Sequence, residues 1–417
     1  MGASGEVTAT RFIPRLPRTA FIVLLGDAVS WFGQGMSLPY LLFYLHQARG
    51  IDLSIAGLVM STVALGSFIG NPVGGWLSDI FGPRAVLGAG VLCSAAGAGT
   101  FAGATSATVA FLAAGLLGLG NAIAWPAFDS LLATVVTAQQ RSSAFAVRNA
   151  TLNIGFALGA VTAALIVDPT RTVTLQAVYV VDAATYAFFV PLLLLIPAGR
   201  PTTTEESVGK PSYRAVLKDR LFLSVVGLSA LMVTVGYSQY HTAFPGWATR
   251  DQGIPPDVLG ICFAANAVTV VVCQIPVLRA LTGRRRTTAV ALACGGWGIT
   301  WLLALIFGYT GSGWLAIGGF VATMIVFGLA ETALAPTLPA IVNDLAPDHL
   351  RGRYNGVSAL GWTTGFFVGP ALTGFALDAD AGAALLATLI AACALGALWA
   401  TYLGRRLPPS ANQITAD

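Results

Sequence analysis

Long apolar runs recur from one end of the 417-residue chain to the other, and they limit what it can fold into. A helix needs about 20 apolar residues to cross a bilayer. Only 10% of the residues are charged, against about 25% in a soluble domain. The sequence therefore predicts an all-α integral membrane protein with twelve transmembrane helices and no large soluble domain. The predicted spans are 19–46, 54–77, 84–104, 107–136, 142–167, 175–197, 221–246, 256–279, 287–308, 313–343, 352–377 and 382–404.

The basic residues indicate the orientation of these spans. With the N-terminus in the cytoplasm, 19 of the 22 Lys and Arg residues lie on the cytoplasmic side, and only Arg49, Arg171 and Arg250 lie outside. This bias follows the positive-inside rule, so both termini are predicted to be cytoplasmic. The residue usage is typical of a GC-rich bacterial genome. We therefore expect a multi-pass protein of the bacterial cytoplasmic (inner) membrane.

Composition and motifs also exclude several functions. The five cysteines all lie in predicted spans without CxxC spacing, which is typical of small buried apolar residues and not of a metal site. The net charge of +4 is accounted for by the cytoplasmic loops, so no nucleic-acid partner is expected. No nucleotide-binding G-x-x-x-x-G-K-[ST] sequence is present. We expect no enzyme activity, no cofactor and no metal; the expected partners are a small-molecule substrate, protons and the lipid bilayer, and the protein is expected to be a monomer.

The longest polar stretch, "AGRPTTTEESVGKPSYRAVLKDR", divides the spans into two groups of six. Its Pro, Thr, Ser and charged residues are typical of a linker. The predicted organisation is a cytoplasmic N-tail at 1–18, a six-helix bundle at 19–197, a cytoplasmic linker at 198–220, a second six-helix bundle at 221–404 and a cytoplasmic C-tail at 405–417.

The two halves also share a sequence repeat. Residues 118–168 align without gaps on 328–378, with a constant offset of 210. The alignment pairs Pro126 with Pro336 and Gly159 with Gly369. A parallel repeat of this kind places a substrate site near the middle of the membrane, between the two halves.

A loop between two spans carries the pattern of a known family. In "GGWLSDIFGPRAVL" the residues Gly75, Asp79, Gly82 and Arg84 resemble the signature G-x-x-x-D-[RK]-x-G-[RK]-[RK] of the major facilitator superfamily. Ile80 stands where the signature has a cation. The resemblance implies two six-helix bundles related by a pseudo-two-fold axis, and a gating role for this loop.

The span at 142–167 is similar to a motif of the drug:proton antiporter branch of that superfamily. The segment "RNATLNIGFALGAVTAAL" has the glycine-rich pattern of the antiporter motif, with Ala160 in place of its proline. The counterpart in the second half, "GFFVGPALTG", does carry Pro370. This resemblance implies efflux by alternating access.

Charged residues inside predicted spans need an explanation, because each costs about 2.5 to 3.5 kcal/mol on insertion. Asp27, Asp129 and Arg148 all lie roughly 9 to 12 Å inside the cytoplasmic face at 1.5 Å per residue, so they are able to meet. One interpretation is a fixed ion-pair cluster. The other is a switch in which Arg148 exchanges partners as a carboxylate takes up a proton.

Glu331 differs because its half of the chain offers no basic partner within the membrane. Burial of an unpaired carboxylate favours its neutral form, which predicts a proton carrier. The alternative is a glutamate that lines a wet cavity and binds a cationic substrate. Both interpretations place Glu331 in the central pathway, and its repeat partner is Asn121.

Two further polar residues are expected to be structural. Asp182 has Tyr179 and Tyr186 at helical spacing, which predicts a snorkelling or tyrosine-bonded role over a functional one. His241, near the outer end of its span, is expected to be interfacial more than catalytic.

Aromatic and amide residues gather in the spans that line the cavity of this fold. A mostly apolar, aromatic cavity binds by contact area and cation–π attraction, which favours amphiphilic or cationic substrates over sugars. The predicted cavity residues are Trp31, Gln34, Asn121, Trp125, Phe128, Asn153, Tyr237, Tyr240, Asn266, Trp362 and Phe366.

The sequence thus favours a secondary active transporter that expels amphiphilic or cationic small molecules in exchange for protons. A proton-coupled importer of a small metabolite or peptide on the same fold is an alternative, because direction is kinetic. A membrane sensor that does not transport is less favoured, because unpaired Glu331 would have no purpose in it.

Overall fold

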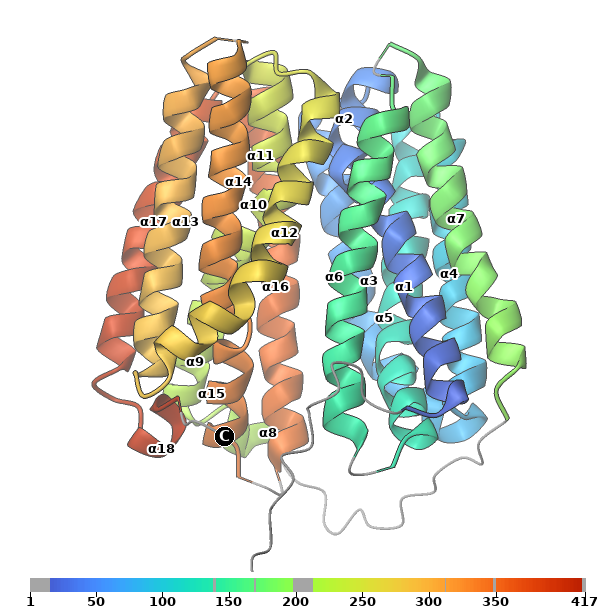
Figure 1. The fold of residues 1–417 in the computed structure, drawn as a ribbon, viewed down its shortest axis with the longest axis vertical. Coiled ribbons are helices and arrows are strands. Elements are labelled where there is room, and N and C mark those ends of the chain that lie inside the picture. Colours follow the sequence, from blue (N-terminus) through green and yellow to red (C-terminus); the bar gives the residue numbers. More distant parts are fainter. Residues whose placement is uncertain are drawn as a thin grey trace, which may run out of the picture.

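Twelve long helical segments follow one another in the described part of the computed structural model, as the apolar runs predict (Figure 1). The structure describes residues 16–137, 140–168, 170–197, 213–311, 313–347 and 350–414. Most of the predicted linker and N-tail lies outside these ranges. By length and composition, eleven segments are apolar enough to cross a membrane. The twelfth, α16 (Arg351–Asp378), is more polar, and four of its residues, Trp362, Thr363, Phe366 and Pro370, border the central cavity.

The first six segments form one bundle and the last six the other (Figure 1). The N-terminal bundle consists of α1 (Arg18–Ser37) with its continuation, α3 (Leu53–Phe81), α4 (Pro83–Ala102), α5 (Ala107–Val135), α6 (Arg141–Ile166) and α7 (Thr172–Leu194). The C-terminal bundle consists of α9 (Arg220–Met232) with its continuation, α12 (Pro256–Leu281), α13 (Arg286–Gly308), α14 (Trp314–Leu334) with α15 (Thr337–Leu345), α16 and α17 (Gly382–Leu403).

The first segment of each bundle is interrupted, although the sequence predicts one continuous span in each. After α1 come a 3₁₀ turn at Leu38–Tyr40, α2 (Leu41–Phe43) and a π-helical turn at Tyr44–Ala48. After α9 come a π turn at Val233–Tyr237, α10 (Ser238–His241), α11 (Ala243–Gly246) and a π turn at Trp247–Asp251. Pro39 and Pro245 lie within these stretches and lack the N–H that an uninterrupted helix would use.

The predicted span 313–343 is also broken, between α14 and α15. Pro336 lies at the break and lacks the N–H that an uninterrupted helix would use. Its repeat partner Pro126 lies inside the continuous α5, so the same residue has a different effect in each half. Glu331 occupies the last turn of α14, and its carbonyl accepts the Ala335 N–H at 3.0 Å.

Two ends of the molecule can be distinguished. We call the end where α7 ends and α9 begins the linker face, and the end with the loops at 49–52, 251–255 and 379–381 the far face (Figure 1). Short helices α8 (Tyr213–Val216) and α18 (Pro409–Asn412) lie at the linker face. The C-tail folds back there, with the Gly283 N–H donating to the Ile414 carbonyl at 2.8 Å.

The bundles pack against each other near the far face through glycines. A Cβ added at Gly57 of α3 would lie 2.4 Å from the Pro370 carbonyl oxygen of α16. A Cβ at Gly260 of α12 would lie 2.8 Å from the Ala160 carbonyl oxygen of α6. Nearer the linker face, a Cβ at Gly75 of α3 or Gly356 of α16 would meet no atom within 4 Å. The closest described approach of the bundles is therefore at the far face.

Candidate functional site

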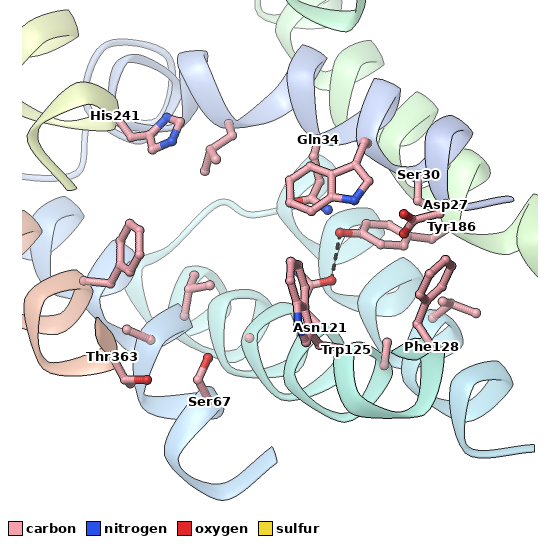
Figure 2. A pocket seen from close by; sticks show the side chains of 18 of the residues that line it. Asp27, Ser30, Gln34, Ser67, Asn121, Trp125, Phe128, Tyr186, His241 and Thr363 are labelled. Carbon is pink, nitrogen blue, oxygen red and sulfur yellow. Dashed lines mark hydrogen bonds between the residues drawn. The ribbon is translucent and has the colours of Figure 1, made fainter. Parts of the chain in front are cut away.

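A cavity of about 420 Å³ lies between the two bundles (Figure 2). Most of its wall comes from the N-terminal bundle, and α10 and α16 supply the rest. The volume is within the range of small-molecule sites, about 300 to 1,000 Å³. Its lining is largely aliphatic and aromatic, with Asp27 and Arg148 as the charged side chains among the described lining residues.

Hydrogen-bonded polar groups fix part of this wall. The Tyr186 hydroxyl of α7 donates to Asn121 Oδ1 of α5 at 2.9 Å (Figure 2), and the Ser94 hydroxyl donates to the same oxygen at 2.9 Å. One amide oxygen thus ties α4, α5 and α7 together at mid-membrane depth. Because both hydroxyls donate to the Asn121 oxygen, its two lone pairs are satisfied and the side chain is held in the cavity wall.

Arg148 of α6 joins two carboxylates from two other helices. Its Nε lies 3.3 Å from Asp27 Oδ2 of α1, and its Nη1 contacts Asp129 Oδ1 of α5. The side chains of Arg148 and Asp27 are 8% and 11% exposed, whereas that of Asp129 is 38% exposed. The structure therefore brings together the three residues that their depth predicts to meet, with water reaching Asp129 more than Asp27.

Aromatic rings cover the same guanidinium. Its carbon lies 4.5 Å from the centroid of Trp125 and 4.1 Å from that of Phe128. A cation above the face of a ring is attracted by the ring quadrupole, and a guanidinium stacks well on it. Arg148 is thus held between two carboxylates and two rings at the edge of the cavity.

The cavity wall contains some of the predicted substrate-binding residues and not others. Those in the wall are Trp31, Gln34, Asn121, Trp125, Phe128, Trp362 and Phe366. Tyr237, Tyr240 and Asn266 lie instead inside the C-terminal bundle. Asn153 donates to the Asn149 carbonyl on the surface of its own helix.

Aromatic packing explains why the two tyrosines lie behind the wall. The Tyr237 ring lies 5.1 Å from Trp297 and 5.3 Å from Trp362, and the Tyr240 ring lies 4.6 Å from Phe263. These rings fill the bundle interior, so only Trp362 reaches the cavity.

Glu331 is not among the described residues that line this cavity. It lies within the C-terminal bundle, beside Asn266 of α12 and near Tyr237 and Tyr240. The ion pairs found in the described residues do not include it. The predicted lack of a basic partner is consistent with these ion pairs, and the place of Glu331 in the central pathway stays a prediction.

The expectations for Asp182 and His241 also change. Asp182 is 1% exposed and accepts a hydrogen bond from the Ser37 hydroxyl at 2.6 Å, so it neither snorkels nor bonds to a tyrosine.

His241 lines the cavity, on the side opposite Asp27 in Figure 2, and is not interfacial. This position could not be predicted from the sequence, because a π turn at Val233–Tyr237 precedes the short helix that holds His241 and changes the side on which the residue lies.

Several other cavity residues carry no signal in the sequence. Ser30, Ser67, Ser238 and Thr363 are small polar residues in apolar spans, where such residues also serve ordinary helix packing. Only the arrangement of the helices shows that they border one space.

The predicted gating loop lies at the linker face, between α3 and α4. Gly82 ends α3 with a φ of 83°, a conformation that suits glycine. Arg84 donates through Nη1 to the Ile196 carbonyl, just beyond α7, so it fastens this loop to the end of its own bundle. Gly75 faces open space, and the side chain of Asp79 lies outside the described residues.

The described residues form twelve long helical segments in two bundles around a central cavity, and eleven of these segments are apolar enough to cross a membrane, an arrangement typical of membrane transporters. The chain belongs to the Major Facilitator Superfamily, whose sequence model matches residues 23–246 and 226–417. It is therefore a transporter and not an enzyme.

Individual relatives are distant but span most of the chain. The chain is 24% identical over 368 residues to the uncharacterized MFS-type transporter YqjV of Bacillus subtilis, covering 86% of each chain. It is 25% identical to a Na(+), Li(+), K(+)/H(+) antiporter of Planococcus maritimus, covering 80% of this chain and 84% of that one. Quinolone resistance protein NorA of Staphylococcus aureus is 21% identical over 61% of this chain and 65% of its own.

Solved structures agree with the fold. The nucleoside transporter NupG superposes with a TM-score of 0.76 at 14% identity, covering 93% of this chain and all of that one. A peptide transporter POT in complex with sulfate gives a TM-score of 0.74 at 16% identity, covering 94% of this chain and 95% of that one. At such identities the likeness shows the fold alone.

Proposed function

We propose that the chain is a monomeric secondary transporter that expels amphiphilic or cationic small molecules in exchange for protons. The observation that carries the proposal is the cluster of two carboxylates on one arginine at the cavity edge. A guanidinium stays charged in proteins, so any proton taken up there binds Asp27 or Asp129. Asp27 is the member of the pair that lines the cavity.

Competition at Asp27 is the basis for exchange. A proton on Asp27 removes the negative charge that would attract a cationic substrate, and a bound cation disfavours the proton. A bound proton lowers the affinity for the substrate, and a bound substrate lowers the affinity for the proton. Binding of one therefore favours release of the other, which is the thermodynamic requirement for antiport. A symporter would need the two to bind together.

The remaining wall favours amphiphilic substrates. Trp31 and Trp125 lie edge to face with ring centroids 6.3 Å apart, and Trp362 and Phe366 face them from α16. Such rings attract cations and bury apolar surface without demanding a fixed hydrogen-bond pattern. The names of two relatives, a quinolone resistance protein and a cation/proton antiporter, support this direction of the proposal.

We assign the linker face to the cytoplasm and the structure to an inward-facing state. The excess of Lys and Arg at that face supports the orientation. The close glycine contacts at the far face, set against open space at Gly75 and Gly356, support the state. Alternating access then consists of breaking the far-face contacts while the linker-face ends approach each other.

Glu331 supplies a second carboxyl for the proton. One proton moving through 100 mV provides about 2.3 kcal/mol, enough to bias two states of similar free energy. Glu331 lies just before the break at Pro336, so its charge state acts on the junction of α14 and α15. We propose that Asp27 governs substrate exchange while Glu331 couples protonation to the movement of the C-terminal bundle.

Transport in vesicles tests the proposal. The purified protein is reconstituted, pH gradients of both signs are imposed, and cationic dyes, drugs and small metabolites are scanned. We expect cationic dyes to move against the proton flow and to release protons when added without a gradient. Movement of a metabolite together with protons would instead establish the importer, and no proton-linked flux of any compound would contradict proton coupling.

A further inference from the structure

A second buried carboxyl, that of Asp182, lies in the N-terminal bundle apart from the arginine cluster. It belongs to α7 and faces α1, where its Oδ2 accepts the Ser37 hydroxyl at 2.6 Å. Its Oδ1 is fully buried and has no hydrogen-bond partner among the described residues. A carboxylate is an acceptor with about four lone-pair sites, so a single donor leaves it poorly satisfied as an anion.

The packing around Asp182 leaves space for its carboxyl group. A Cβ added at Gly33 of α1 would lie 2.6 Å from Asp182 Oδ1 and 2.1 Å from Thr185 Oγ1. The missing side chain at Gly33 therefore provides the space that both polar groups occupy. The Thr185 hydroxyl donates to the Asp182 carbonyl at 2.7 Å, so it does not serve the carboxyl as a donor.

The titratable neighbours on α7 and on the turn after α1 do not compensate a negative charge. Tyr179 donates to the Ser37 carbonyl at 3.2 Å, and Tyr186 donates to Asn121. The Tyr44 ring lies tilted against that of Tyr179 with centroids 4.7 Å apart, and its hydroxyl accepts a hydrogen bond from Arg49, so this cation is bound to Tyr44 and not to the carboxyl.

The other packed helices offer no partner either. On α4 the Cys93 thiol donates to the Leu116 carbonyl, and Arg84 at its start holds the Ile196 carbonyl. Asp27 of α1 and Asp129 of α5 are bound to Arg148. Among the described residues no cation pairs with Asp182, and burial of an unpaired anion is far costlier than burial of the neutral acid.

The position of Asp182 separates it from the substrate site. Its partner Ser37 follows Asp27 by ten residues on α1, which is about 15 Å toward the far face. Ser37 is the last residue of α1, directly before the 3₁₀ turn at Leu38–Tyr40. Gln34 and Tyr186, one turn away on the same two helices, line the cavity.

We propose that Asp182 is a proton-binding site, which holds a proton on Oδ1 in this state and releases it when α1 moves at the 3₁₀ turn. Release breaks the Oδ1–H bond and passes the proton to water, and the carboxylate keeps the Ser37 hydroxyl as its donor. The ligand class is the proton alone, because the site is too enclosed for a larger cation. The site would add a carboxyl at the middle of α7, on the far-face side of Asp27, to those already described.

Infrared spectroscopy of the full chain in lipid tests this directly, without any transport. We expect the wild type to show a carbonyl band of protonated carboxylic acid at neutral pH, part of which disappears in alkaline buffer. Asp182→Asn should remove that part, whereas Asp27→Asn, the matched control, should retain it. Because the readout is a bound proton, it does not depend on the proposed antiport.

Two results would overturn the proposal. The first is a band that Asp182→Asn leaves unchanged. The second is an Asp182 band that persists at alkaline pH, which would make the group a permanently neutral structural acid. If Asp182→Asn fails to fold, Ser37→Ala replaces it: loss of the hydroxyl donor should change the pH at which the band disappears, and an unaltered titration counts against the site.

Discussion

Arg148 of α6 links α1 and α5 at the edge of the cavity, because it pairs with both Asp27 and Asp129. Trp125 and Phe128 cover the same guanidinium with their rings. A charge buried in a membrane helix is costly without a partner, so the arginine and the carboxylates depend on one another for their place in the bundle.

Arg148→Ala should destabilise the protein more than Arg148→Lys. Removing the cation leaves buried Asp27 without a partner, which should cost about 3 to 5 kcal/mol, and solvent screens the charge of half-buried Asp129; lysine keeps the charge but loses the stacking. Melting temperature in detergent is the measurement. Asp27→Asn should be milder, because Arg148 keeps Asp129 as a partner.

An Arg148→Ala variant that melts like the wild type would contradict the cluster as a stabilising element. Equal losses for Ala and Lys would mean that ring stacking and geometry matter more than charge.

Glu331→Gln should uncouple transport from the pH gradient. Glutamine imitates the neutral acid, so binding of substrate and downhill flux should persist while gradient-driven extrusion is lost. Substrate-induced proton movement in proteoliposomes is the measurement, with Glu331→Asp expected to keep partial coupling. If Glu331→Gln moves protons with wild-type stoichiometry, Asp27 carries the coupled proton without Glu331, and the coupling role of Glu331 is contradicted.

The sequence does not predict which side of their helices Tyr237, Tyr240 and Asn266 face. In a soluble helix the polar face reveals which side is buried, but lipid is as apolar as the bundle core. A tyrosine in such a helix gives no indication of whether it faces the cavity, the core or the lipid. The structure places these two tyrosines in aromatic packing behind the wall.

At the scale of elements, the helix ends could be predicted closely, and the interruptions could not. Apolar runs end where charged and turn residues begin, so span 107–136 corresponds to α5 at Ala107–Val135. Pro126 and Pro336 occupy equivalent positions, yet only the second lies at a break. Whether a proline breaks a helix depends on the neighbours that satisfy the freed carbonyl, which is tertiary information.

Gly57→Ala should weaken closure at the far face. The added Cβ would lie 2.4 Å from the Pro370 carbonyl oxygen, a backbone atom that can yield only if α3 and α16 separate. We expect several-fold slower transport and greater reactivity of far-face cysteines introduced as reporters. Gly115→Ala on α5, where a Cβ meets no atom within 4 Å, is the matched control.

Unchanged far-face reactivity in a folded Gly57→Ala protein would show that this crossing is not the closure. If Gly57→Ala gives too little folded protein, Gly260→Ala tests the same closure, because Gly260 lies at the equivalent crossing of α12 on α6.

At the scale of the whole molecule, the sequence repeat predicts the symmetry that the structure shows. Gly57 contacts the carbonyl oxygen of Pro370, and Gly260 contacts that of Ala160. Ala160 and Pro370 are 210 positions apart, which is the offset of the sequence repeat. The sequence cannot tell which of two states the bundles adopt, because one chain must be compatible with both and they differ by only a few kcal/mol. That choice appears only when the contacts at the two faces are compared.

The last prediction concerns the side from which the cavity is reached. Ser67 lines the cavity on α3, whereas Ser61, two turns nearer the far face on the same helix, is 0% exposed and donates to the Gly57 carbonyl. In a background without the native cysteines, Ser67→Cys should react with a membrane-impermeant thiol reagent added at the linker face, and Ser61→Cys should not. Because the bundles are joined at the far face, reagent added there should label Ser67→Cys at least tenfold more slowly.

Inverted and right-side-out vesicles provide the two directions of access. An imposed pH gradient should change the ratio of the two labelling rates if protonation moves the bundles. Equal labelling from both sides, or labelling only from the far face, would contradict the inward-facing assignment; a ratio unaffected by pH would contradict the coupling of protons to the bundle movement.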